Sequence, residues 1–547
     1  MKNIKKWKEF GELDLELKQA LDLLTDLELE DAFYKDLDFG TNRMNIYTLR
    51  KANYGFGKYL LKKYPHPAVV IAYDSRHKSY EFAIDCARTL GALNIKVYFF
   101  GKITPTPQLS FAVRRLQAQG GIVITASHNP PQYNGYKIYD EYGCQMVPDL
   151  IEEVKEEIKK APDAFFIQVG NFSELQKVGM ITEVEKEIDD EYLKLVRGVG
   201  IKPELEKDDF LVVFTPLHGT AALFGERLLQ NIGYHYRLVS EQMIPDPNFS
   251  TVDYPNPEDP KAFRLAFEYG EKYHADILLA TDPDADRIGL AVLDEGIYHL
   301  LSGNQTGAIL LYYLINEKKN IGPGVVFNTV VTSDLGAKIA RVAGLDVKST
   351  LTGFKYIGEQ AKFLEGTDKE FFFGYEESFG FVVKPFVRDK DSLQALVLCC
   401  EAANFYKLQG KTLIQVLEEI FQKYGYHQEE LVNLQLEGKK GSSKIKKIMN
   451  YFRDYPVSQF GNYFISAKED YLIRTRSTES GISPLLLPAS DVIKFYLEDG
   501  SWVVLRPSGT EPKLKIYLAT VSESSLDAEA KIKELKNIIL KMIDKVG

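Results

Sequence analysis

The sequence predicts an α/β fold built from three similar units, followed by a smaller α+β domain. In the first 430 residues, short apolar runs alternate with helical patterns, and several of these runs end directly in polar loops. The same plan occurs three times, with leading strands at 68–73, 210–214 and 325–327. The length of 547 residues also exceeds the roughly 250–300 residues that one hydrophobic core can serve.

The predicted domains are residues 1–205, 206–320, 321–430 and 431–547. Each of the first three contains a second apolar strand that ends in a polar loop, at 125–130, 281–287 and 374–380 respectively. The last domain has strand patterns at 492–496, 502–505 and 514–519, a loop at 506–512 and a long closing helix. The basic segment 438–447 is expected to be a solvated linker that runs into a helix.

Composition excludes several classes of protein. With 45% hydrophobic and 26% charged residues, the chain is typical of a soluble globular protein, and no apolar run approaches the ~20 residues of a membrane span. A net charge of −10 and a pI near 5.6 argue against a nucleic-acid binder. Four cysteines form no disulfide framework, and no signal peptide is recognised, so we expect a cytoplasmic protein. We also expect a monomer or a small homo-oligomer.

Ser127 is the candidate nucleophile of the first unit. The apolar run 121–124 leads into the turn 125–130 (TASHNP), which places a hydroxyl at the carboxyl end of a buried strand. His128 beside it would suit a serine hydrolase, but adjacent side chains of an extended segment point apart. The Gly-x-Ser-x-Gly elbow of such hydrolases is also absent. Lys137, just past the turn, could act as an acid or base if burial lowered its pKa.

Three aspartates predict a metal site in the second unit. Asp282, Asp284 and Asp286 alternate along the segment that follows the strand at 275–280, so their carboxylates can converge on one cation. Hard oxygen ligands favour Mg²⁺. A calcium loop of the EF-hand type would need Gly at Arg287 and Glu at Leu293, and is excluded. The alternative is an acidic surface turn.

Two further loops carry binding chemistry. In 506–512 (RPSGTEP), Arg506, Ser508, Gly509 and Thr510 offer a guanidinium fork, hydroxyls and a close backbone approach, which suit a phosphate. The alternative is a plain hairpin loop. In 374–380 (GYEESFG), alternate residues Glu376 and Ser378 can face one polyol such as a sugar, with Glu377 on the other side. The charge cluster 388–391 is either a site or a solvated loop.

Taken together, these loops resemble the α-D-phosphohexomutase family. Four motifs occur in the family's order, at 125–130 (TASHNP), 282–287 (DPDADR), 374–378 (GYEES) and 506–512 (RPSGTEP), and the match spans nearly the whole chain. The resemblance implies four domains around a central cleft, with mixed sheets in the three α/β domains. It also implies an isomerase that works through phosphoryl transfer.

The resemblance also assigns roles to residues. Ser127 would carry a phosphoryl group, with His128 beside it, and Ser127 would join the three aspartates in holding Mg²⁺. Lys137 and Lys390 would be the general acid and base. The remaining residues, expected to bind substrate, are Arg76, Arg287, Thr352, Gly353, Lys355, Glu376, Ser378, Arg506, Ser508, Gly509 and Thr510.

The function that the resemblance implies is interconversion of glucose 1-phosphate and glucose 6-phosphate, with glucose 1,6-bisphosphate as activator and intermediate. The same loops would serve mannose or pentose phosphates, or a hexose-bisphosphate synthase. A non-catalytic sugar-phosphate binder and a Mg²⁺-dependent phosphatase are the alternatives from other classes. The intact Ser127 and Lys390 oppose the binder, and the phosphate loop at 506–510 disfavours the phosphatase.

One stretch departs from the family pattern. The family has a Gly- and Arg-containing loop between a Phe-Gly-Thr and an Asn-Arg-Met-Asn segment, whereas here Thr41 runs directly into Asn42. Either the natural chain lacks this loop or the printed sequence omits it, and the intact flanks favour the omission. A true deletion would remove an arginine expected near the phosphoserine and impair catalysis.

Overall fold

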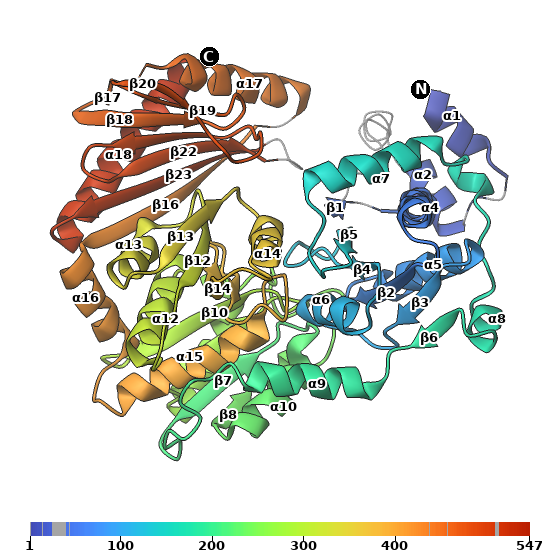
Figure 1. Cartoon of the computed structure of the whole chain (residues 1–547), viewed down its shortest axis with the longest axis horizontal. Coiled ribbons are helices and arrows are strands. Elements are labelled where there is room, and N and C mark those ends of the chain that lie inside the picture. The colour runs from blue at the N-terminus through green and yellow to red at the C-terminus, as the bar shows by residue number, and fades with distance from the viewer. Residues whose placement is uncertain are drawn as a thin grey trace.

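Three mixed sheets and one antiparallel sheet organise the chain, which confirms the predicted fold class (Figure 1). The computed structural model describes residues 2–11, 13, 15–23, 40–42, 44–436, 438–456, 458–508 and 513–546. The predicted boundaries between domains stay predictions, and we use the names domain I to domain IV for the parts of the chain that carry the four sheets.

Domain I has a sheet in the order β1-β5-β4-β2-β3-β6, in which β2 pairs in parallel with β3 and β4, and β4 pairs antiparallel with β5. β1 runs through Thr41 and Asn42 as one strand. The strands are β1 (Gly40–Asn42), β2 (Ala68–Tyr73), β3 (Lys96–Phe99), β4 (Gly120–Ile124), β5 (Asn134–Asp140) and β6 (Ile181–Glu183). The helices are α1 (Lys2–Glu9), α2 (Leu15–Leu23), α4 (Ile46–Lys63), α5 (Ser79–Ala92), α6 (Thr106–Arg115), α7 (Pro148–Lys160), α8 (Phe172–Lys177) and α9 (Lys186–Arg197).

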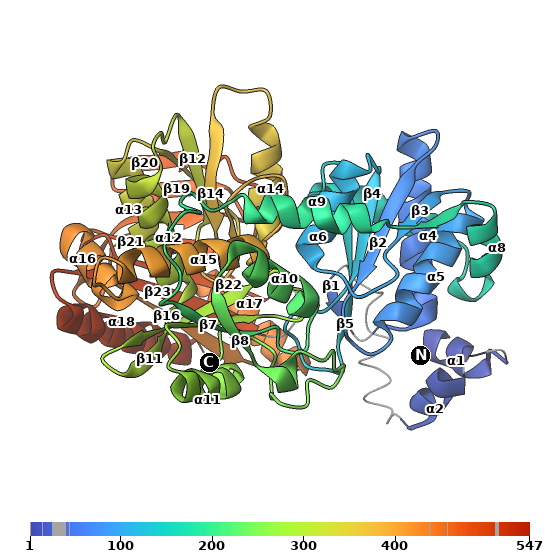
Figure 2. The same cartoon turned by 90° about the horizontal axis from the view of Figure 1, so that it is seen from below.

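Domain II follows α9, which runs between the domain I sheet and the rest of the molecule (Figure 2). Its sheet has the order β11-β10-β9-β7-β8, and the antiparallel pair β9–β10 carries the aspartate loop at its turn. The elements are β7 (Leu211–Thr215), α10 (Ala221–Ile232), β8 (His235–Leu238), α11 (Arg264–Tyr273), β9 (Ile277–Thr281), β10 (Ile288–Asp294) and β11 (Ile297–Leu300).

Domain III has a four-stranded sheet in the order β13-β12-β14-β15, and helix α15 extends from it to pack against α10, β9 and β10 of domain II. One large apolar cluster therefore includes side chains of domains I, II and III. The elements are α12 (Gly303–Glu317), β12 (Gly324–Thr329), α13 (Asp334–Val342), β13 (Asp346–Thr350), α14 (Phe354–Phe363), β14 (Glu370–Tyr375), β15 (Phe381–Val382), α15 (Ser392–Lys407) and α16 (Leu413–Tyr424).

Domain IV is an antiparallel sheet in the order β16-β23-β22-β21-β18-β19-β20, packed against α17 and α18. The segment predicted as a basic linker is instead the start of α17, where Ile445, Ile448 and Met449 bury one helical face and Lys446 and Lys447 stay exposed. The elements are β16 (Tyr426–Gln435), α17 (Gly438–Asp454), β17 (Gln459–Phe460), β18 (Tyr463–Asp470), β19 (Thr475–Thr478), β20 (Gly481–Pro484), β21 (Ile493–Leu497), β22 (Trp502–Pro507), β23 (Lys513–Ser522) and α18 (Ser525–Lys545).

Candidate active site

Ser127 lies just after β4, in a left-handed conformation with φ of 52°. Its amide donates to Thr125 Oγ1 (2.9 Å), and its hydroxyl donates to Asp282 Oδ2 of domain II (2.6 Å). His128 Nδ1 is 3.4 Å from Ser127 Oγ, and burial, followed by the charge of Arg287, holds the pKa of His128 well below its usual value. The hydroxyl therefore faces a carboxylate of another domain, and His128 is a neutral neighbour.

Arg76 holds the Ser127 turn from behind. Its guanidinium donates to the backbone carbonyls of Ser127, Asn129, Pro130 and Tyr133. The side chain is buried and its Nε lies 3.2 Å from Asp74 Oδ2. On its other side, the ring of Phe249 from domain II lies 4.9 Å from the guanidinium carbon. These contacts occupy the guanidinium with the loop itself, which favours a positioning role over the predicted contact with substrate.

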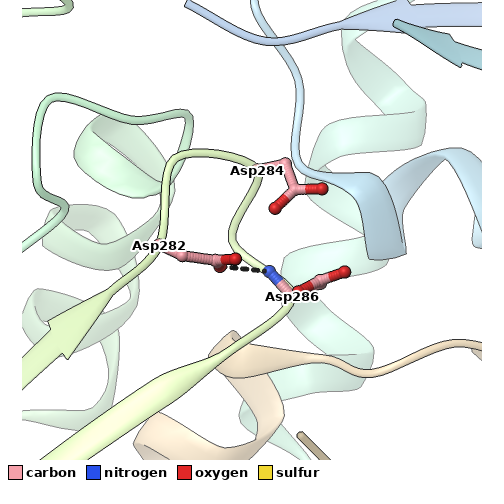
Figure 3. Close-up of side chains that lie close together, drawn as sticks. All are labelled: Asp282, Asp284 and Asp286. Carbon is pink, nitrogen blue, oxygen red and sulfur yellow. Dashed lines mark hydrogen bonds between the residues drawn. The ribbon is translucent and has the colours of Figure 1, made fainter. Parts of the chain in front are cut away.

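The three aspartates converge as predicted, but around a turn and not along an extended segment, as Figure 3 shows. One carboxylate oxygen from each lies within 4.8 Å of the others, and all three residues are buried. Asp282 Oδ1 accepts the amides of Asp286 (3.0 Å) and Arg287 (2.9 Å), so the loop folds back on its first carboxylate. Ala285 adopts φ of 57° at the turn. The backbone thus fixes the spacing of the carboxylates.

These residues fit a hard divalent cation. Asp284 Oδ1 and Asp286 Oδ1 are buried and accept no hydrogen bond from the described residues. Burial and the neighbouring carboxylates Asp284 and Asp286 raise the pKa of Asp282 well above its usual value. Buried carboxylates with free lone pairs are destabilising unless a cation compensates them. The donor set of three carboxylates is one that Mg²⁺ prefers.

Two lysines lie beside the aspartates. Lys137 Nζ is 3.1 Å from Asp284 Oδ2, and Lys390 Nζ is 2.9 Å from Asp286 Oδ2. Burial alone would lower the pKa of each lysine, but the aspartates outweigh it, and the pKa of both is raised. The condition set for Lys137, a pKa lowered by burial, is therefore not met. Both ammonium groups are charged at neutral pH and neutralise part of the carboxylate charge.

Neighbouring domains hold the aspartate loop in place through two hydroxyls that the sequence did not point to. Thr106, at the first turn of α6 in domain I, donates from Oγ1 to Asp284 Oδ2 (3.0 Å) and from its amide to Asp284 O (2.9 Å). Ser392, at the start of α15, donates to Ala285 O (2.6 Å). The prolines at 105 and 107 indicate the start of a helix and could have pointed to Thr106. For Ser392, the only indication in the sequence was its position directly after the cluster 388–391.

The loop of domain III with the expected sugar ligands adjoins the aspartate loop. Arg287 and Gly380 form an antiparallel bridge, and Ser378 Oγ donates to Glu376 Oε2 (3.3 Å). Burial raises the pKa of Glu376 to about 7, and its Oε1 has no described hydrogen-bond partner. Glu258, a residue that sequence reasoning missed, lies 2.5 Å from Arg287 Nη1. Glu376 and Ser378 thus share one side of the loop, as the alternation predicts.

A cationic group lies where domains III and IV meet. Burial, followed by the charge of Arg506, lowers the pKa of both Lys355 and Lys515. Gly353 precedes α14 with φ of 116°, and Thr352 Oγ1 is buried without a described partner. Ser508 donates its amide to Lys513 O, whereas Gly509 and Thr510 lie outside the described residues. Mutually repelling cations are suited to an anion such as a phosphate.

The comparisons with known proteins agree with this arrangement. Four family models match in order: "Phosphoglucomutase/phosphomannomutase, alpha/beta/alpha domain I" over residues 37–164, domain II over 190–296, domain III over 302–424, and the C-terminal domain over 431–532. Four domains of which three are α/β, with a serine beside three buried aspartates, define a phosphohexomutase. The chain belongs to the phosphoglucomutase/phosphomannomutase family of α-D-phosphohexomutases, which are intramolecular phosphotransferases.

Curated relatives extend the match. A phosphoglucomutase of Staphylococcus aureus (strain MRSA252) is 38% identical over 532 residues, which cover 94% of this chain and 95% of that protein. Another from the bovine strain RF122 is 39% identical over 522 residues, covering 92% and 93%. Among solved structures, a phosphoglucomutase/phosphomannomutase family protein from Burkholderia thailandensis superposes with a TM-score of 0.68 at 19% identity, covering 94% of this chain and 98% of that one. The likeness to the last supports the fold alone.

Among the described residues, no helix combines the length and apolar character that crossing a bilayer requires. All four cysteines are free and buried.

Proposed function

We propose that the chain catalyses the phosphoglucomutase reaction, interconverting glucose 1-phosphate and glucose 6-phosphate. The observation that carries the proposal is the Ser127 hydroxyl, 2.6 Å from Asp282 within a buried group of three carboxylates and two ammonium groups. Phosphoryl transfer depends on positioning and charge neutralisation more than on covalent assistance, and this group supplies both. The relatives named phosphoglucomutase support glucose phosphates as the substrate.

In the proposed cycle, Ser127 carries a phosphoryl group between the two ends of the sugar. A sugar hydroxyl attacks phosphorus, its O–P bond forms as the Ser127 Oγ–P bond breaks, and glucose 1,6-bisphosphate results. A lysine gives its proton to Ser127 Oγ as the Oγ–P bond breaks, and the neutral amine then takes the proton of the attacking sugar hydroxyl. The bisphosphate then reorients, and Ser127 Oγ takes the other phosphoryl group. In that second transfer the lysine protonates the departing sugar oxygen and takes the proton of the Ser127 hydroxyl.

Lys137 and Lys390 are the proposed acid and base. Because the aspartates raise the pKa of both lysines, each begins as a proton donor. Lys390 lies 2.9 Å from Asp286, and Lys137 lies 3.1 Å from Asp284. Their nearness to the aspartate loop supports the proposal that they protonate an oxygen that gains charge beside Ser127. A lysine that has donated its proton can act as the base of the reverse transfer. His128, neutral and 3.4 Å from Ser127 Oγ, helps to shape the turn.

Ser127, Asp282, Asp284 and Asp286 would hold Mg²⁺. When bound, the metal ion would withdraw charge from the phosphoryl oxygens during transfer. Asp284 and Asp286 each have an Oδ1 atom that accepts no hydrogen bond from the described residues, which supports their assignment as ligands. Thr106 and Ser392 keep the loop in place from the two adjacent domains.

Substrate recognition is proposed for two groups of residues. Glu376 and Ser378 would bind sugar hydroxyls, and the cationic group at the junction of domains III and IV would bind the phosphate that does not react. The phosphate set is Arg506, Ser508, Gly509 and Thr510, with Lys515, and the lining residues are Arg287, Thr352, Gly353 and Lys355. Sugar monophosphates are thus the proposed partners, and the reducing cytoplasm is the proposed compartment.

A substrate panel tests the proposal. Glucose, mannose and ribose 1-phosphates would be assayed with Mg²⁺ and catalytic glucose 1,6-bisphosphate, for the wild type and Ser127→Ala. We expect glucose 1-phosphate to give the highest kcat/KM and Ser127→Ala to be inactive. Preference for mannose or ribose phosphate would reassign the substrate within the family. Isomerisation by Ser127→Ala at the wild-type rate would contradict the phosphoserine cycle.

A further inference from the structure

The turn 329–333 of domain III contacts the sheet of domain IV on one side and the sugar loop on the other. It follows β12 and is closed by a hydrogen bond from the Thr332 amide to Thr329 O (3.1 Å). Its outer side faces the sheet of domain IV, which carries the phosphate loop, and its inner side faces Glu377 of the sugar loop. Among the described residues, the turn is therefore a physical link between the two substrate-binding parts that the proposed function requires.

Lys494 makes the contact on the outer side. It projects from β21 of domain IV, is 4% exposed, and donates from Nζ to Val330 O across the domain boundary (2.8 Å). Its ammonium lies 4.3 Å from the centre of the Trp502 ring and 4.7 Å from that of Tyr496. A buried ammonium is costly without an acceptor, so the carbonyl of Val330 fixes where the turn can sit against domain IV.

Apolar packing adds to this contact. Val330 and Val331 of the turn share one cluster with Trp502, Val504 and Tyr517 of the domain IV sheet. Val330 and Val331 are 3% and 2% exposed, so the turn packs closely against the sheet of domain IV. A shift of domain IV would therefore move the turn with it, because close-packed interiors transmit displacement.

On the inner side, two hydroxyls of the turn hold the sugar loop. Thr329 Oγ1 and Thr332 Oγ1 both donate to Glu377 Oε2, at 3.1 and 3.2 Å. Glu377 lies between Glu376 and Ser378, the proposed ligands of the sugar hydroxyls. Fixing Glu377 therefore fixes the backbone from which both of its neighbours project.

We propose that Lys494 is a positioning residue that couples the seating of domain IV, and with it the phosphate loop, to the sugar loop through the turn 329–333. The inference rests on the proposed function, because it concerns how that site is assembled. Lys494 contacts neither the aspartates nor Ser127 in the described structure, so its effect is expected on substrate binding and less on the chemical step.

A double-mutant cycle tests the coupling. Lys494→Met keeps the packing over Trp502 but removes the donor, and Thr332→Val removes one hydroxyl from Glu377. We expect each variant to raise KM for glucose 1-phosphate about five- to tenfold with a smaller change in kcat, since one hydrogen bond to a charged group is lost. If both act through one turn, the double variant matches the larger single effect. A product of the two effects, about 25- to 100-fold, would overturn the coupling.

The matched control is Lys468→Met. Lys468 lies in the same sheet and also donates to backbone carbonyls, those of Arg453 and Tyr455, but these belong to domain IV itself (2.8 Å each). We expect it to lower stability without changing KM. A rise in KM equal to that of Lys494→Met would show that weakening domain IV is sufficient and would overturn the proposal. Absence of glucose 1-phosphate turnover by the wild type would instead count against the proposed function.

Trp502 gives a second readout that needs no change at Lys494. The chain has two tryptophans, so Trp7→Phe leaves Trp502 as the only one. Ser127→Ala is added to prevent turnover. Trp502 is buried at the boundary with the turn 329–333, so we expect its fluorescence to change with glucose 1-phosphate concentration and to reach saturation. Thr332→Val should reduce this change by more than half at saturation. An unchanged amplitude in Thr332→Val would contradict the coupling even if Lys494→Met did not fold.

Discussion

Replacing Arg76 with lysine separates a positioning role from a contact with substrate. The guanidinium of Arg76 donates to four carbonyls of the Ser127 turn and pairs with Asp74. A lysine keeps the charge, but its compact ammonium cannot reach carbonyls spread over residues 127–133. We expect two or three hydrogen bonds to be lost, which at about 0.5–1.5 kcal/mol each destabilises the turn by about 1–4.5 kcal/mol.

The expected kinetic result follows from the position of these carbonyls. Because Ser127 O is one of the acceptors, the loss displaces Ser127 from Asp282, and a displacement of about 1 Å can lower a rate about 100-fold. We expect kcat to fall by that order while KM for glucose 1-phosphate changes less than threefold. Steady-state kinetics, with thermal unfolding to monitor the fold, measures both quantities.

Arg88→Lys is the control for this experiment. Arg88 also lies in domain I and donates to a backbone carbonyl, that of Gly170 (2.8 Å), but this carbonyl is not in the Ser127 turn. We expect Arg88→Lys to lower stability without the fall in kcat. A large rise in KM for Arg76→Lys at unchanged kcat would refute the positioning role and restore the predicted contact with substrate.

Three other perturbations follow from the site and one from the domain III–IV junction. Asp284→Asn should lower kcat at least 100-fold and raise the Mg²⁺ concentration needed for half-maximal activity, whereas Asp294→Asn, at the far end of β10, should do neither. Lys390→Met should lower kcat about 10²–10⁴-fold, as loss of a general acid does; wild-type kcat would exclude it from the acid–base pair. Burial raises the pKa of Glu376 to about 7, so its carboxylate takes up a proton as the pH falls from 8 to 6 and can then accept fewer hydrogen bonds. The ratio of the KM of the wild type to that of Glu376→Gln should therefore change over this pH range. A constant ratio would contradict the role of Glu376 in binding the sugar. Burial lowers the pKa of His427 to about 4, so between pH 6.5 and 4 the unfolded chain takes up a proton that the folded chain does not. The free energy of unfolding should therefore fall by up to about 3 kcal/mol as the pH is lowered through this range. In His427→Asn, denaturant unfolding measured at a series of pH values should show a smaller fall.

The sequence predicted the elements that carry the site because each follows a local rule. The strand pattern at 68–73 matches β2, and Asp282, Asp284 and Asp286 place three carboxylates within 4.8 Å of one another. Both patterns depend on residues that are close together in the chain. The same holds for Glu376 and Ser378, whose side chains share a hydrogen bond. The aspartates converge through a turn at Ala285, however, and not along the extended segment that the alternation assumed.

What the sequence could not show depends on contacts between distant segments. Thr106 reaches Asp284 across 178 positions of the chain, and Phe249 covers Arg76 from another domain. The direction of the pKa of Lys137 also depends on which carboxylates lie near it, because burial and ion pairing act in opposite senses. The start of α17 was predicted wrongly for a related reason: its lysines suggested solvent, whereas the partners of its apolar face lie in a sheet far along the chain.

The most direct test of the account is whether Ser127 carries the phosphoryl group between the two ends of the sugar. Wild-type protein and Ser127→Ala would each be incubated with Mg²⁺ and glucose 1,6-bisphosphate labelled with ³²P, then digested and analysed by mass spectrometry. We expect close to one labelled phosphate per wild-type chain, on the peptide containing Ser127, and none on Ser127→Ala. Adding glucose 1-phosphate should release the label as bisphosphate. Label on another residue, or turnover of glucose 1-phosphate by the wild type without any label on Ser127, would contradict the account.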